Sequence, residues 1–166
     1  METIDYNGQE DWSSDAILQR YTLYCKQLQV NESVDLTPKT LVQGDKKWIW
    51  PVMEIVIEGI ENGEIACKLI GIEFIEQDRK FSFGKILKSN TARALRRTNL
   101  EEEDKKRIRR RLVSMLLTGN VPHEYKEYAK LLKKVGLENY RENLEESINR
   151  SNQYVMKYFN YLIDVY

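Results

Sequence analysis

Apolar residues recur every three or four positions in successive segments of this chain, and short runs containing Gly, Pro or Asn separate the segments. Such spacing puts the apolar side chains on one face of an α-helix, and that face must pack against another element. The pattern runs from Ser14 to Leu28 and fills most of the chain beyond Pro51. We therefore predict an all-α fold, a compact array of six to eight short helices.

Residues 48–76 allow two interpretations, because they are rich in isoleucine and contain the turn-forming pair Asn62-Gly63. A β-hairpin across this pair would mix charged and apolar side chains on each face. Two helices broken at the pair instead align Glu54, Glu58 and Glu61 on one stripe, opposite the apolar residues. The pattern favours two helices, and an α+β fold with one β-hairpin at 48–76 is the alternative.

Several other helix boundaries follow from capping residues. The sequence predicts a short helix from Ser89 or Asn90 to Arg97, a long helix capped by Asn99 with Glu102 that runs to Thr118, and a helix from Pro122 to Gly136. Two further helices fill the rest of the chain. The last one carries many aromatic residues, of which Tyr154, Tyr158 and Phe159 are expected in the core.

The length of 166 residues matches one domain of ordinary size. We expect a single helical domain over residues 1–166, with residues 1–11 and 30–47 as loops or poorly ordered segments, because helical periodicity fails there. The first residues are acidic and lack an apolar run, and no stretch is apolar enough to span a bilayer. These features predict a cytoplasmic protein with no membrane partner.

Charge is divided unevenly along a chain whose formal net charge is zero. Residues 1–78 carry 15 acids and 6 bases, whereas residues 79–166 carry 11 acids and 20 bases. The stretch from Arg79 to Arg111 alone holds 13 bases against 4 acids. This asymmetry predicts an oriented electrostatic surface.

A basic strip on helices can contact successive phosphates, and arginine adds forked hydrogen bonds that lysine cannot make. We therefore predict a non-enzymatic helical module that binds DNA, RNA or another polyanion. The candidate binding residues are Lys85, Lys88, Arg93, Arg96, Arg97, Lys106, Arg107, Arg110 and Arg111.

Two alternatives remain open for the basic strip and its neighbours. Glu101–Glu103 precede Lys105–Arg107 by four positions, a spacing that forms intrahelical ion pairs and leaves Arg110 and Arg111 without local partners. The protein could then be a regulatory or scaffold module that binds another protein or a second copy. Tyr161 and Tyr166, beyond the main apolar stripe of the last helix, suit a homodimer interface.

Residues for catalysis are few. The single histidine, His123, excludes the usual two-histidine zinc sites, and we expect it to cap or pack at a surface. Cys25 and Cys67 lie in apolar stretches and are expected to be buried and reduced. A metal-dependent hydrolase using Asp104 and Glu124 is a weaker alternative, since Glu124 and its expected helper Lys126 diverge by about 200° on a helix. We predict no cofactor.

Overall fold

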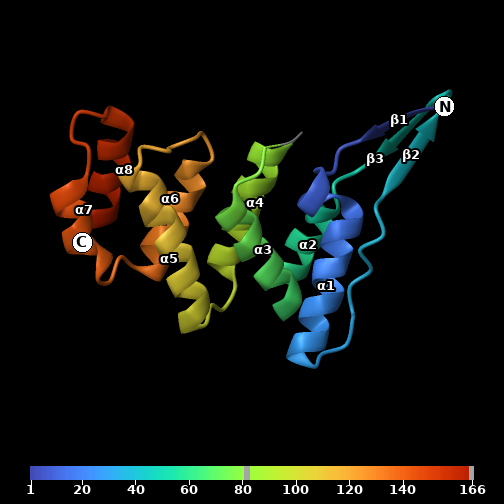
Figure 1. Cartoon of the computed structure of the whole chain (residues 1–166), viewed down its shortest axis with the longest axis horizontal. Helices are drawn as coiled ribbons and strands as arrows, with labels where there is room; N and C mark the ends of the chain where they lie inside the picture. The colour runs from blue at the N-terminus through green and yellow to red at the C-terminus, as the bar shows by residue number, and fades with distance from the viewer. Residues whose placement is uncertain (81–82, 165–166) are drawn as a thin grey trace.

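The computed structural model describes residues 1–80 and 83–164, which form eight α-helices and three short strands. The helices stand in a row along the longest axis of the molecule (Figure 1). Their bounds are α1 Ser14–Leu28, α2 Val52–Glu61, α3 Ile65–Gln77, α4 Gly84–Arg97, α5 Glu102–Leu117, α6 Tyr125–Val135, α7 Tyr140–Ser147 and α8 Gln153–Ile163.

The helices form two layers. Odd-numbered helices contact one another in the order α1, α3, α5, α7, and even-numbered helices do so in the order α2, α4, α6, α8. Neighbours along the chain, such as α2 with α3 and α5 with α6, pack across the two layers. This stacking of antiparallel helices is the arrangement of an α-solenoid, in which each helix contacts only near neighbours.

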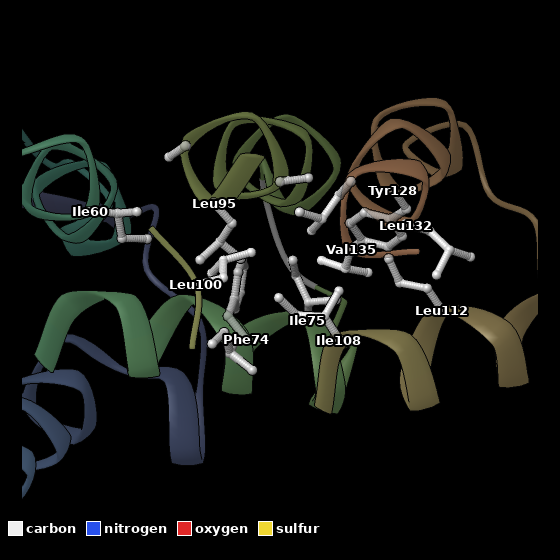
Figure 2. Close-up of a cluster of buried hydrophobic side chains, with 14 of the residues drawn as sticks. Ile60, Phe74, Ile75, Leu95, Leu100, Ile108, Leu112, Tyr128, Leu132 and Val135 are labelled. Atoms are coloured by element: carbon white, nitrogen blue, oxygen red, sulfur yellow. The ribbon is translucent and has the colours of Figure 1, made fainter. Parts of the chain in front are cut away.

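The hydrophobic core runs between the layers. Figure 2 shows Phe74 and Ile75 of α3, with Ile108 of α5, opposite Leu95 of α4 and Val135 of α6. All five side chains are buried. Because each layer contributes apolar residues at helical spacing, the core is continuous along the row.

Two glycines bring α2, α3 and α4 close together. A Cβ at Gly59 would lie 2.5 Å from Cys67 Sγ, and one at Gly71 would lie 2.6 Å from Ile60 Cδ1. Both cysteines, Cys25 and Cys67, are buried and free, as predicted.

A small sheet extends from the α1 end of the row (Figure 1). β1 (Glu2–Asp5) pairs in parallel with β3 (Lys46–Ile49), and β3 pairs antiparallel with β2 (Thr40–Gln43). Gly44, with φ of 60°, occupies the first of the two turn positions between β2 and β3, the position at which a type II′ turn takes Gly. β1 and β2 are therefore the edge strands.

The predicted all-α class is thus incomplete, since a helix-dominated fold carries a small β element. The alternative with a β-hairpin was right in containing one and wrong in its position, because the hairpin lies at residues 40–49. Of the segments expected to be loops or poorly ordered, residues 1–11 contain β1, and residues 30–47 contain β2 and the start of β3. A four-residue strand is too short to show a clear alternation of apolar and polar residues. These strands are defined by their pairing with one another, which sequence periodicity does not predict.

The two-helix interpretation of residues 48–76 is confirmed. Glu54, Glu58 and Glu61 are exposed along one stripe of α2, and Gly63, with φ of 82°, turns the chain into α3. Isoleucine is common here because α2 and α3 are buried over most of their surface. Packing between helices outweighs the β propensity of that residue.

Other boundaries differ from the prediction. α4 begins at Gly84, five residues before the predicted cap at Ser89. α5 begins after Glu101, whose backbone N–H donates to Asp104 Oδ2 at 3.0 Å, so the predicted cap at Asn99 was wrong.

The last helix also departs in part from the prediction. Phe159 is buried and Tyr158 is half-buried, but Tyr154 is 61% exposed and does not belong to the core. Tyr161 is exposed, and its backbone carbonyl accepts a hydrogen bond from Lys133 Nζ at 2.9 Å. Tyr166 lies outside the described residues.

Candidate polyanion-binding face

The basic residues of the sequence separate between the two helical layers. α4 carries five bases and no acid, and α6 carries four bases and one acid. α5 carries the other large group, but it lies in the opposite layer beside the acidic side chains of α3. We name the first group the α4–α6 face and define it by Lys85, Arg93, Arg96, Arg97, Lys126, Lys130, Lys133 and Lys134.

The α5 bases are largely neutralised. Arg107 forms a hydrogen-bonded ion pair with Glu76, and Arg110 Nη2 lies 3.8 Å from the same carboxylate. Arg111 Nη2 lies 3.3 Å from Asp78 Oδ2. The basic residues on the side of α5 that faces α3 therefore form ion pairs within the protein, between neighbouring odd-numbered helices.

The predicted intrahelical pairs of α5 were wrong in their partners. Lys105 lies 3.1 Å from Glu102 and Lys106 lies 3.9 Å from Glu103, three rather than four residues apart. Arg107 pairs with α3 instead. Arg110 and Arg111, expected to have no local partner, find theirs on and just after α3, because packing of the odd-numbered layer brings these acids close.

The α4–α6 face keeps an excess of positive charge around one buried acid. Arg93 Nη2 and Lys130 Nζ lie 3.5 and 3.3 Å from Glu127 Oε1, and Arg96 Nη1 lies 3.7 Å from Oε2. Burial alone would raise the pKa of Glu127, but the hydrogen bond from Lys130 and the charges of Arg93 and Arg96 lower it on balance. One ionised carboxylate thus faces three cations.

Lys134 joins the C-terminal ends of the same two helices. Its Nζ donates to the backbone carbonyls of Arg96 and Thr98, the latter at 2.8 Å. Burial, together with the nearby charges of Lys105 and Arg96, lowers the pKa of Lys134. Cations at this end of the face therefore repel one another, which favours binding of an anion.

The spacing of the basic residues places their side chains in a line along each helix. Lys85, Ser89, Arg93 and Arg96 follow at intervals of four, four and three, which places them on one stripe of α4. Lys126, Lys130 and Lys133 form the matching stripe of α6. Each stripe is about 11–16 Å long at a rise of 1.5 Å per residue.

The predicted binding residues fall into four groups in the structure. Lys85 and Arg97 are exposed and have no ion pair within the described residues, and Arg93 and Arg96 share Glu127. Lys88 is buried, with its Nζ 2.7 Å from Asp78 Oδ1. The rest belong to α5.

Sequence reasoning missed the α6 contribution. Lys126, Lys130, Lys133 and Lys134 lie beyond the basic stretch that ends at Arg111. Their spacing of three and four was a usable signal for one stripe. That this stripe lies beside α4 depends on the packing of alternate helices, which the sequence does not show.

The candidates for catalysis have different neighbours in the structure. Cys67 is buried against α2, and burial raises its pKa to about 12, so the thiol is protonated at neutral pH. His123 is exposed before α6. Asp104 Oδ2 lies 2.7 Å from Lys68 Nζ, whereas Glu124 lies near Lys88. Within residues 1–80 and 83–164, no cluster of three or more His, Cys, Asp or Glu could hold a metal ion.

Comparisons with protein-family models, curated proteins and solved structures find no match for this chain. In the part of the chain that the structure describes, no helix has both the length and the apolar character needed to cross a membrane.

Proposed function

We propose that this protein is a non-enzymatic helical module that binds nucleic acid through the α4–α6 face. The observation that carries the proposal is the convergence of Arg93, Arg96 and Lys130 on the single buried carboxylate of Glu127. One acid cannot balance the bases of two adjacent helices, so the face attracts a polyanion. Two parallel stripes of cations suit the regular charge of a phosphate backbone.

Fluorescence anisotropy with labelled single-stranded and duplex oligonucleotides tests this proposal. If about four phosphates are contacted, log affinity falls with log salt with a slope of roughly −2.8 for a single strand and −3.6 for a duplex. No binding at micromolar protein and low salt, or binding that is indifferent to salt, would contradict the proposal.

Charge-reversal variants test whether oligonucleotides bind at the α4–α6 face. Arg97 and Lys126 are exposed and have no ion pair within the described residues, so Arg97→Glu with Lys126→Glu changes the charge of the face without removing a described ion pair. Lys26→Glu with Lys39→Glu is the matched control, because these exposed lysines lie in the N-terminal half and the net charge changes equally. We expect the first variant to lose at least tenfold in affinity and the control to lose much less.

A second candidate is self-association through the edge strand β2. All four residues of β2 are exposed, none is charged, and Leu41 and Val42 are 49% and 55% exposed. Charged residues usually protect such edges, as Glu2 and Asp5 do on β1. Twofold antiparallel pairing of β2 with a second copy puts Leu41 opposite Val42, with no like charges facing each other.

Light scattering at high protein concentration tests this second candidate. We expect a dimer for the natural sequence and a monomer for Val42→Lys, whose charge would lie in the new sheet. A natural sequence that stays monomeric would contradict self-association and leave the polyanion proposal unaffected.

A further inference from the structure

A pocket of about 390 Å³ lies between the N-terminal ends of α4 and α6. Lys80 and Lys85 line it on one side, Asn120 and His123 line it on the other, and Lys88 and Glu124 contribute buried side chains. Its size falls within the range of small-molecule sites. Lys85 also begins the α4 stripe, so the pocket and the α4–α6 face are continuous.

Glu124 provides a hydrogen-bond acceptor that nothing in the described chain fills. Its side chain is only 4% exposed, and Oε2 has no hydrogen-bond partner within residues 1–80 and 83–164. The other oxygen, Oε1, makes only a 3.8 Å ion-pair contact with Lys88 Nζ. A buried carboxylate oxygen without a donor is costly, so both oxygens favour a ligand that brings N–H groups.

The surrounding charges favour neutral donors over a cation. Lys88 lies 2.7 Å from Asp78 and 3.8 Å from Glu124, and Arg111 lies 3.3 Å from Asp78, so two cations already face these two acids. Lys80 and Lys85 add positive charge and have no ion pair within the described residues. A ligand for this pocket therefore combines neutral N–H donors with a separate anionic group.

The helix ends reinforce that charge pattern. Among the described residues, neither α4 nor α6 has a side-chain hydrogen bond at its N-cap, and residues at the N-terminal ends of both helices line the pocket, so the positive ends of two helix dipoles lie beside it. An anionic group is favoured here, next to Lys85. A nucleotide has this combination, with donors on the base and charge on the phosphate.

We propose that this pocket binds an unpaired guanine base of a single strand whose phosphates lie along the α4–α6 face, an inference that rests on the function proposed above. Guanine carries two adjacent donors, N1–H and N2–H₂, on one edge, and they match the two carboxylate oxygens of Glu124, neither of which accepts a hydrogen bond from the described residues. Adenine lacks this pair of donors. Hypoxanthine, the base of inosine, keeps N1–H and lacks the amino group.

Thymidine strands with one central guanosine, inosine or adenosine test the pocket against wild-type protein in anisotropy titrations. We expect the guanosine strand to bind at least fivefold more tightly than the inosine and adenosine strands, the discrimination typical of a good bidentate base contact. Glu124→Gln should remove this preference and keep the salt dependence. Glu142→Gln, an exposed acid on α7, is the matched control and should keep both.

The titrations distinguish failure of the guanine pocket from failure of the proposed function. Salt-dependent binding of all three strands with equal affinity would overturn the guanine pocket and leave the polyanion face in place. Absence of binding to every strand would overturn the proposed function and the pocket with it. Because the base comparison uses wild-type protein, it decides the question even if Glu124→Gln fails to fold.

Discussion

Lys68 Nζ of α3 lies 2.7 Å from Asp104 Oδ2 at the start of α5, and both side chains are almost buried. The same oxygen of Asp104 accepts the backbone N–H of Glu101 at 3.0 Å, so one carboxylate joins two helices and caps one of them. Removal of either charge leaves its partner buried and unpaired.

Replacement of Asp104 by Ala should therefore lower the free energy of unfolding by about 3 kcal/mol, measured by urea denaturation. In the double variant Lys68→Met with Asp104→Leu, no buried charge remains unpaired, and the loss should shrink to the cap contribution of about 1 kcal/mol. Equal losses in the two variants would contradict the expected cost of leaving the Lys68 charge buried and unpaired.

Glu127 links stability to pH. Its pKa is lowered in the folded protein, so it contributes stability that is present above the unfolded-state pKa of about 4.3 and is lost as pH falls through the folded value. Glu127→Gln should lower the free energy of unfolding by about 1 kcal/mol at pH 7, and this difference from wild type should vanish in acid.

Denaturant titrations of both proteins at neutral and acidic pH measure that difference. Glu142→Gln, which alters an exposed acid, should match wild type at each pH. A difference for Glu127→Gln that stays constant with pH would contradict the stated role of its charge.

The close approach of α2 and α3 at Gly59 predicts an overpacking effect. A methyl group there would lie 2.5 Å from Cys67 Sγ, so Gly59→Ala should destabilise the protein by about 1–3 kcal/mol, despite the better helix propensity of Ala. Adding Cys67→Ala removes the sulfur and should recover part of the loss. Thermal unfolding of the four proteins of this cycle measures the coupling, and strict additivity would contradict it.

Arg97 and Arg107 should behave in opposite ways. Arg97 is exposed without an ion pair in the described chain, so Arg97→Ala should change stability by less than about 0.5 kcal/mol and weaken oligonucleotide binding. Arg107→Ala removes the contact with Glu76 and should cost about 1 kcal/mol of stability without weakening binding. Reversed effects would place the binding surface on α5 rather than on α4 and α6.

Local patterns in the sequence determined most of the helices. Apolar spacing predicted α1, α2 and α3, and Gly119 and Gly136 end helices where they were expected to. These features could be read because the residues that decide them lie within a few positions of one another. The three strands could not be predicted from the sequence. Each is only four residues long, and β1 pairs in parallel with β3, more than 40 residues further along the chain.

The candidate site shows the same division between local and long-range information. The sequence by itself determined that bases gather after residue 78 and that those from Arg93 to Arg111 lie on helices, whereas Lys85 and Lys88 were not predicted to be helical. Only the tertiary structure decided that Glu76 of α3 and Asp78 just after it pair with Arg107, Arg110 and Arg111, and that α6 adds a second stripe beside α4. Both outcomes follow from the packing of alternate helices in layers, which brings together charges some 30 residues apart in the sequence. Helical periodicity relates only residues within the same helix, so it cannot predict these contacts.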